Sequence, residues 1–93
     1  MGIKTKDGYI LEKINEKGDY MLSEPNSKRF HLLNKTTAQI IRWCDGNNDR
    51  DAIMTSYATE YAVEDSFVDK LKGEASSILD RLVDLGVMEE ATN

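Results

Sequence analysis

Cysteine, histidine and proline each occur only once in this chain of 93 residues. One cysteine cannot form an internal disulfide, and one cysteine with one histidine is too few for a zinc site, which needs several such ligands at defined spacing. Cys44 lies among apolar residues, so we expect a small buried side chain rather than a nucleophile, because burial raises the pKa of a thiol. The sequence therefore predicts no metal ion, no cofactor and no catalytic group.

Long apolar runs are also missing. No stretch approaches the roughly 20 apolar residues that a membrane-spanning helix requires. The first six residues carry charges but no apolar signal core follows them, so the sequence gives no support for secretion, and a cytoplasmic location is expected. A chain of this length is expected to fold as a single domain over residues 1–93, with a core too small to enclose a substrate and a cofactor together. We therefore expect a protein that is not an enzyme.

The chain lacks the basic stripe that nucleic-acid-binding proteins use to neutralise phosphates. Residues 1–46 contain 8 Lys and Arg against 6 Asp and Glu, a net charge of +2. Residues 47–93 contain 4 against 11, a net charge of −7, which together give the overall −5. The C-terminal half is thus expected to be an acidic, helical body.

Strand patterns come first along the chain and helical patterns follow. Strands are predicted over residues 9–15, 20–23 and 30–33, separated by turn residues, and helices over residues 37–44, 50–61 and 65–85. Asn34 or a capping box of Thr36 and Gln39 would begin the first helix, Asn48 or Asp49 would begin the second, and glycines 46 and 86 would end the first and third. The order predicts an α+β fold: an N-terminal three-stranded antiparallel sheet followed by three helices.

The third predicted helix has more apolar positions than one core-facing stripe requires. Its stripe is Leu71, Ala75, Ile78, Leu82 and Leu85. A second, half-apolar flank consists of Val68, Lys72, Ser76, Leu79 and Val83. Either the sheet covers this flank, or the flank is the floor of a groove beside the third strand, on which an extended peptide could rest.

The third strand is expected to be an edge of the sheet, because a sequential meander leaves its first and third strands unpaired on one side. Its candidate binding residues are Lys28, Arg29, Phe30, His31, Leu32 and Leu33. Lys28 and Arg29 either discourage indiscriminate strand pairing or hold an acidic partner segment.

Several runs of residues resemble one known family. They are Leu-Leu-Asn-Lys-Thr at 32–36, Trp-Cys-Asp-Gly at 43–46, the segment 57–61, and the helix end Leu-Asp-Arg-Leu-Val-Asp-Leu-Gly-Val at 79–87. With these runs the chain resembles the PqqD family, whose members are peptide chaperones, or recognition elements, for ribosomally made and post-translationally modified peptides (RiPPs). The resemblance implies a winged-helix-like fold. It also implies that the leader segment of a precursor peptide adds to the third strand beside the third helix and is presented to a modifying enzyme, often a radical S-adenosylmethionine (SAM) protein.

Two other interpretations stay open at this stage. A winged helix-turn-helix protein that binds DNA also combines three helices with a small sheet, but residues 64–85 contain six acids and three bases, which would repel phosphate. The chain could alternatively be the recognition domain of a larger enzyme.

Overall fold

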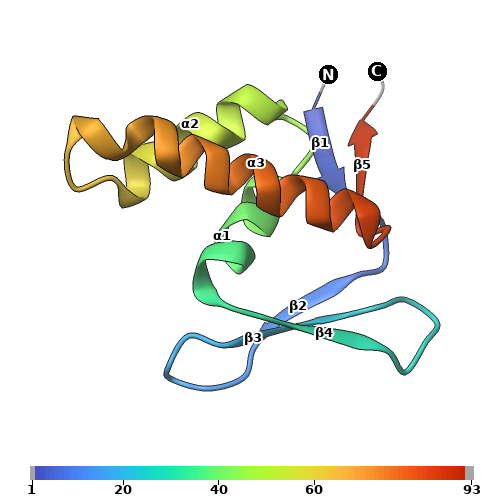
Figure 1. Ribbon diagram of the computed structural model, residues 1–93. Coiled ribbons are helices and arrows are strands. Elements are labelled where there is room, and N and C mark those ends of the chain that lie inside the picture. Colours follow the sequence, from blue (N-terminus) through green and yellow to red (C-terminus); the bar gives the residue numbers. More distant parts are fainter. Residues whose placement is uncertain (1, 92–93) are drawn as a thin grey trace.

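The computed structural model describes residues 2–91 as a small α+β fold (Figure 1). The strands are β1 (Gly2–Thr5), β2 (Ile10–Lys13), β3 (Tyr20–Ser23), β4 (Phe30–Leu33) and β5 (Met88–Ala91). The helices are α1 (Lys35–Trp43), α2 (Arg50–Tyr61) and α3 (Val68–Asp84), and a short 3₁₀ turn, η1 (Asp65–Phe67), leads into α3. No helix within residues 2–91 is both long enough and apolar enough to cross a bilayer.

Strands β2, β3 and β4 form the predicted antiparallel meander in sequential order. Figure 1 shows this sheet on one side of the molecule and the helices on the other. Its inner face carries the buried side chains of Tyr20 and Leu22. Its outer face, in contrast, exposes Ile10, Phe30 and Leu32, which are 56%, 54% and 68% exposed. Such a patch is unusual, because the solvent face of an antiparallel sheet is normally polar.

A second sheet was not predicted. Strand β1 pairs antiparallel with β5, so the two ends of the described chain lie side by side (Figure 1). The other edge of β1 is also bonded, because the N–H of Ile3 donates to the Asn48 carbonyl at 2.9 Å and that of Thr5 to the Cys44 carbonyl at 3.0 Å. Gly2 makes this close approach possible, since a Cβ there would lie 2.1 Å from the carbonyl oxygen of Gly46. The prediction of one three-stranded sheet was therefore incomplete.

The helix ends follow the capping residues of the sequence. The Asn34 side chain accepts a hydrogen bond from the Thr37 N–H at 2.9 Å, so Asn34 rather than Thr36 begins α1. The Asp49 side chain likewise accepts from the Ala52 N–H at 2.8 Å and begins α2. After α3 the chain turns at Gly86, whose φ of 79° belongs to the left-handed region that favours glycine. These caps place α1 directly after the edge strand β4.

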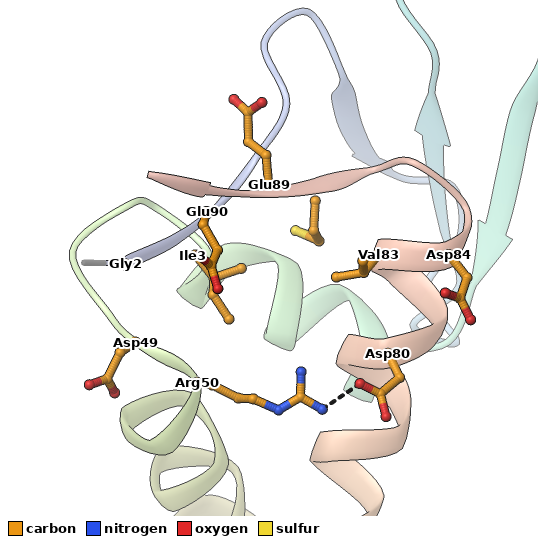
Figure 2. Close-up of a pocket in the computed structure, with 10 residues that line it drawn as sticks. Gly2, Ile3, Asp49, Arg50, Asp80, Val83, Asp84, Glu89 and Glu90 are labelled. Carbon is orange, nitrogen blue, oxygen red and sulfur yellow. Dashed lines mark hydrogen bonds and ion pairs between the residues drawn. The ribbon is translucent and has the colours of Figure 1, made fainter. Parts of the chain in front are cut away.

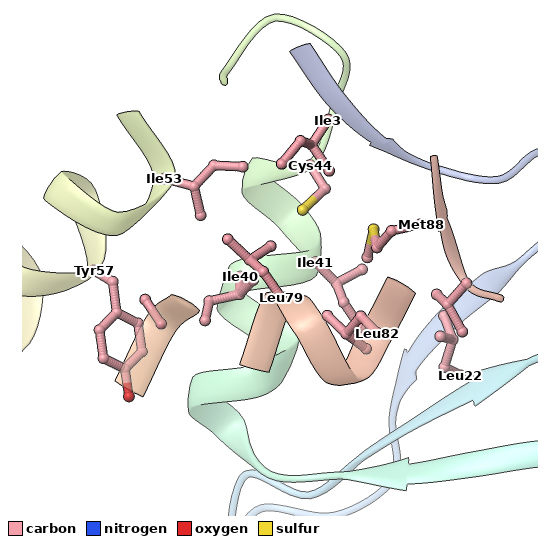
Figure 3. Packing of buried hydrophobic residues seen from close by; sticks show 12 residues of the cluster. Ile3, Leu22, Ile40, Ile41, Cys44, Ile53, Tyr57, Leu79, Leu82 and Met88 are labelled. Carbon is pink, nitrogen blue, oxygen red and sulfur yellow. The ribbon is translucent and has the colours of Figure 1, made fainter. Parts of the chain in front are cut away.

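The core lies where the three helices meet, and both sheets contribute to it (Figure 3). Ile40, Ile53 and Leu79, one from each helix, are completely buried. The β1–β5 ribbon adds Ile3 and Met88, and the meander adds Leu22. Each fully buried aliphatic side chain of this kind contributes about 1.5–3 kcal/mol to the free energy of unfolding. The helices and both sheets therefore fold around one shared core.

Cys44 belongs to this core, and its reactivity provides a test of the packing. Burial, with a smaller effect of the neighbouring Asp45 carboxylate, raises the pKa of the Cys44 thiol from 9.0 to about 12. At pH 8 we expect Ellman's reagent to label the native protein about a thousandfold more slowly than the urea-unfolded protein, because the thiolate is the reactive form. Above about pH 9 only the unfolded thiol ionises, so the contribution of Cys44 to stability declines from there towards pH 12. Rapid labelling of a protein with native circular dichroism would contradict this packing.

Candidate functional site

The free edge of β4 has backbone groups available for a further strand. At the hairpin end the Glu24 N–H donates to the Arg29 carbonyl at 3.1 Å. Hydrogen-bonded and non-bonded pairs alternate along an antiparallel ladder, so His31 and Leu33 bond to β3. The N–H and C=O groups of Phe30 and Leu32 consequently point away from β3. No other strand among residues 2–91 pairs with this edge, as the sequence predicted.

A groove of about 530 Å³ lies beside this edge, between β4, the start of α1 and the C-terminal half of α3. Its strand side consists of Phe30–Leu33, and Asn34 and Thr37 line the α1 end. Its helix side consists of Ile78, Arg81, Leu82 and Leu85. Leu82 is 2% exposed whereas Leu85 is 48% exposed, so the groove has a buried apolar floor and an open apolar rim. A free strand edge beside an apolar groove can bind an extended peptide by both its backbone and its side chains.

In the part of the chain that the structure describes, two basic side chains and no acidic side chain line the groove. The Nε2 atom of His31 lies 2.9 Å from the Glu24 carboxylate, so this imidazole already has a partner within the sheet. Arg81 is exposed and makes no ion pair or hydrogen bond through its side chain with any residue in the range 2–91. The groove therefore presents one unmatched positive charge over an apolar floor.

The structure brings together the strand half of the predicted site but not its helix half. Residues 30–33 line the groove, and Lys28 and Arg29 precede them in the β3–β4 turn. The five predicted helix residues lie elsewhere. Leu79 is completely buried in the core, Val68 and Lys72 line a depression beside α2, Ser76 accepts a hydrogen bond from Arg50, and Val83 faces the opposite side of α3. The prediction of these five as a groove floor was wrong.

The rotation of α3 about its axis explains this error. The predicted core stripe was centred between Leu71, Ile78 and Leu82, but the buried positions of α3 are Ala75, Leu79 and Leu82. At about 100° per residue, the core-facing direction is turned by about 50° from the predicted stripe. Ile78 and Leu85, predicted as core, therefore form the rim of the groove, and Leu79, predicted as groove floor, lies in the core.

Val83 contributes to a larger cleft of about 880 Å³ on the other side of α3 (Figure 2). The β1–β5 ribbon and the start of α2 form its remaining walls. Acidic side chains dominate its lining: Asp49, Asp80, Asp84, Glu89 and Glu90. Its single cation, Arg50, donates to Asp80 at 2.6 Å and to the Ser76 carbonyl at 2.9 Å, so this charge holds α2 against α3. The two sides of α3 thus differ in charge, because the groove carries a free cation and the cleft carries an excess of carboxylates.

Comparisons with known proteins identify a family and a fold. The family model of coenzyme PQQ synthesis protein D (PqqD) matches residues 19–88. Among solved structures, the chain is similar to TbiB1 in complex with the TbiA(beta) leader peptide, with a TM-score of 0.71 and 14% sequence identity. This match covers 97% of the present chain and 99% of the other. No curated protein matches the sequence.

Stability measurements can test the observed positions of Leu79 in the core and Leu85 at the rim of the groove. We expect Leu79→Ala to lower the free energy of unfolding by about 3 kcal/mol, because it leaves a cavity in the core. Leu85→Ala is expected to cost less than about 1 kcal/mol, since nearly half of that side chain is exposed. Urea denaturation followed by circular dichroism measures both values. Equal costs for the two variants would contradict the observed rotation of α3.

Proposed function

This chain belongs to the PqqD family, and from that premise we propose that it binds the leader segment of a ribosomally made precursor peptide on a winged-helix-like scaffold. The observation that carries the proposal is the unpaired edge of β4 beside the apolar groove on α3. The chain acts as a carrier and performs no chemistry itself. Its partners are the leader peptide and the enzyme that modifies the precursor, in the cytoplasm where the peptide is made.

In this proposal the leader adds to β4 as a fourth strand of the meander. Its backbone pairs with the outward N–H and C=O groups of Phe30 and Leu32. Alternate side chains of the added strand then point into the groove towards Leu82 and Leu85, because side chains alternate between the faces of a sheet. Backbone pairing supplies sequence-independent affinity and the groove supplies selectivity. Lys28 and Arg29, next to the same edge, are proposed to contact the end of the bound segment.

The structural similarity to TbiB1 supports the proposal that the ligand is a leader peptide. That protein is in complex with a leader peptide, and the present chain shares its fold over almost the whole length of both chains. The fold alone does not select the peptide, since the two sequences are 14% identical. The selectivity for one peptide therefore has to come from the residues that line the groove in this chain.

The outer face of the meander supports a role for a modifying enzyme, which we propose to be a radical SAM maturase. Ile10, Phe30 and Leu32 form an uncovered apolar surface on the face opposite the helices. A leader strand paired with β4 would extend this surface and leave it uncovered. The chain can therefore hold the peptide by its edge and contact an enzyme by its outer face at the same time.

Replacing Leu32 by proline tests the strand addition. Proline removes the outward N–H of Leu32, and the fold should tolerate it because that group makes no bond to β3. We expect the affinity for the leader segment of its precursor peptide to fall at least about tenfold relative to Leu32→Ala, which keeps the N–H. Isothermal titration calorimetry measures both affinities. Equal affinities in two folded variants would exclude pairing along this edge.

Replacing Ile10 by lysine tests the proposed enzyme contact, since β2 forms the edge of the meander farthest from β4. We expect Ile10→Lys to slow modification of the precursor at least about fivefold in a reaction reconstituted from chain, precursor and enzyme, because a charge now lies in an apolar contact. Its affinity for the leader should not change. Thr59→Lys, on the exposed surface of α2, is the matched control for the added charge. If the enzyme modifies the precursor equally fast with Ile10→Lys and with the wild type, the outer face does not contact the enzyme.

A further inference from the structure

The unmatched guanidinium of Arg81 indicates which peptides the groove selects, an inference that rests on the proposed function. The other residues on the helix side of the groove, Ile78, Leu82 and Leu85, are apolar. The other basic side chain that lines it within residues 2–91, the imidazole of His31, lies 2.9 Å from the Glu24 carboxylate. A peptide bound in the groove therefore meets one free positive charge surrounded by apolar surface.

The nearest acids of α3 are turned away from this groove. Asp80 and Asp84 flank Arg81 in sequence but line the cleft on the opposite side of the helix, where Asp80 is paired with Arg50 (Figure 2). Glu74 and Arg81 both line a neighbouring depression on α3, but Glu74 lies two turns earlier, is not part of the groove lining and forms no ion pair with Arg81. Residues 2–91 thus supply no carboxylate to the groove, and a ligand that brings one would complete a charge-assisted pair.

We infer that the bound segment carries an Asp or Glu that pairs with Arg81, and an apolar side chain two residues away that packs on Ile78 or Leu85. Side chains on one face of a strand are about 6.7 Å apart. With a rise of about 1.5 Å per residue, the separation along the helix axis is about 4.5 Å between Arg81 and Ile78 and about 6 Å between Arg81 and Leu85. Neighbouring groove-facing side chains of one strand can therefore reach the guanidinium and an apolar rim residue together.

Selection of peptides from a random library tests this inference without knowledge of the natural precursor. A display library of 12-residue random peptides is selected in parallel on the wild-type chain and on Arg81→Glu. The wild type should enrich Asp or Glu two positions from Leu, Ile, Val or Phe, and Arg81→Glu should enrich Lys or Arg at the acidic position instead. Lys70→Glu makes the same charge change at an exposed position of α3 outside the groove, so it should keep the wild-type consensus.

One selected peptide then provides a quantitative check by a double-mutant cycle. Replacing its acidic residue by the matching amide should weaken binding to the wild type about five- to tenfold and leave binding to Arg81→Gln almost unchanged. Arg81 also lies in the last turn of α3, where a cation stabilises a helix, so circular dichroism must show that both variants are folded. If Arg81→Glu does not fold, the cycle with Arg81→Gln decides the question alone.

The outcomes separate the two proposals. An identical consensus on the wild type and Arg81→Glu, or an amide substitution with no effect, would overturn the role of Arg81. If those peptides still lose affinity for Leu32→Pro, the proposed strand addition stands. Selected peptides that bind Leu32→Pro as well as Leu32→Ala would instead overturn strand addition at β4.

Discussion

Burial of Ala75, Leu79 and Leu82 against the other helices sets the rotation of α3, and the groove depends on that rotation. The buried side chains Leu79 and Leu82 together contribute about 3–6 kcal/mol, a substantial part of the net stability of a small domain. A single substitution at the rim of the groove changes the free energy of unfolding by less than this contribution. The core therefore determines that Ile78, Arg81 and Leu85 face β4, and that Val83 and Asp84 face the cleft.

The β1–β5 ribbon also limits which strand edges a peptide could pair with. It covers one side of the core with Ile3 and Met88, and loop 44–48 bonds the remaining edge of β1. The outer edges of β2, β4 and β5 stay unpaired among residues 2–91. Of these three, β4 alone borders a groove with an apolar floor and a free cation, and β5 borders a cleft rich in carboxylates. Side-chain chemistry beside the edge thus distinguishes β4 from the other edges.

Local signals in the sequence predicted most elements, and long-range pairing accounts for what was missed. The meander, the caps Asn34 and Asp49 and the bounds of α2 depend on neighbouring residues, which are visible in the sequence. The β1–β5 ribbon joins residues more than eighty positions apart, and Met88–Ala91 contains two glutamates in four residues, so it has no apolar strand pattern. The rotation of α3 was missed for a similar reason. Its apolar positions span roughly 160° of its circumference, which is wider than the roughly 100° stripe that faces a core, and only its tertiary neighbours decide which of them are buried.

The charge of α3 also favours a peptide over DNA as the ligand of this fold. In a DNA-binding winged helix, a helix with a basic or neutral exposed face enters the major groove beside phosphates. The four acids of α3, Asp69, Glu74, Asp80 and Asp84, outnumber its three cations, Lys70, Lys72 and Arg81. Asp80 and Asp84 line a cleft to which Glu89 and Glu90 add further negative charge. Entry of this helix into a DNA groove would bring these carboxylates towards phosphates without enough cations to balance them. The one α3 cation that lines the groove, Arg81, is suited to a single carboxylate on a peptide, so the electrostatics of α3 favour a peptide strand over a nucleic acid.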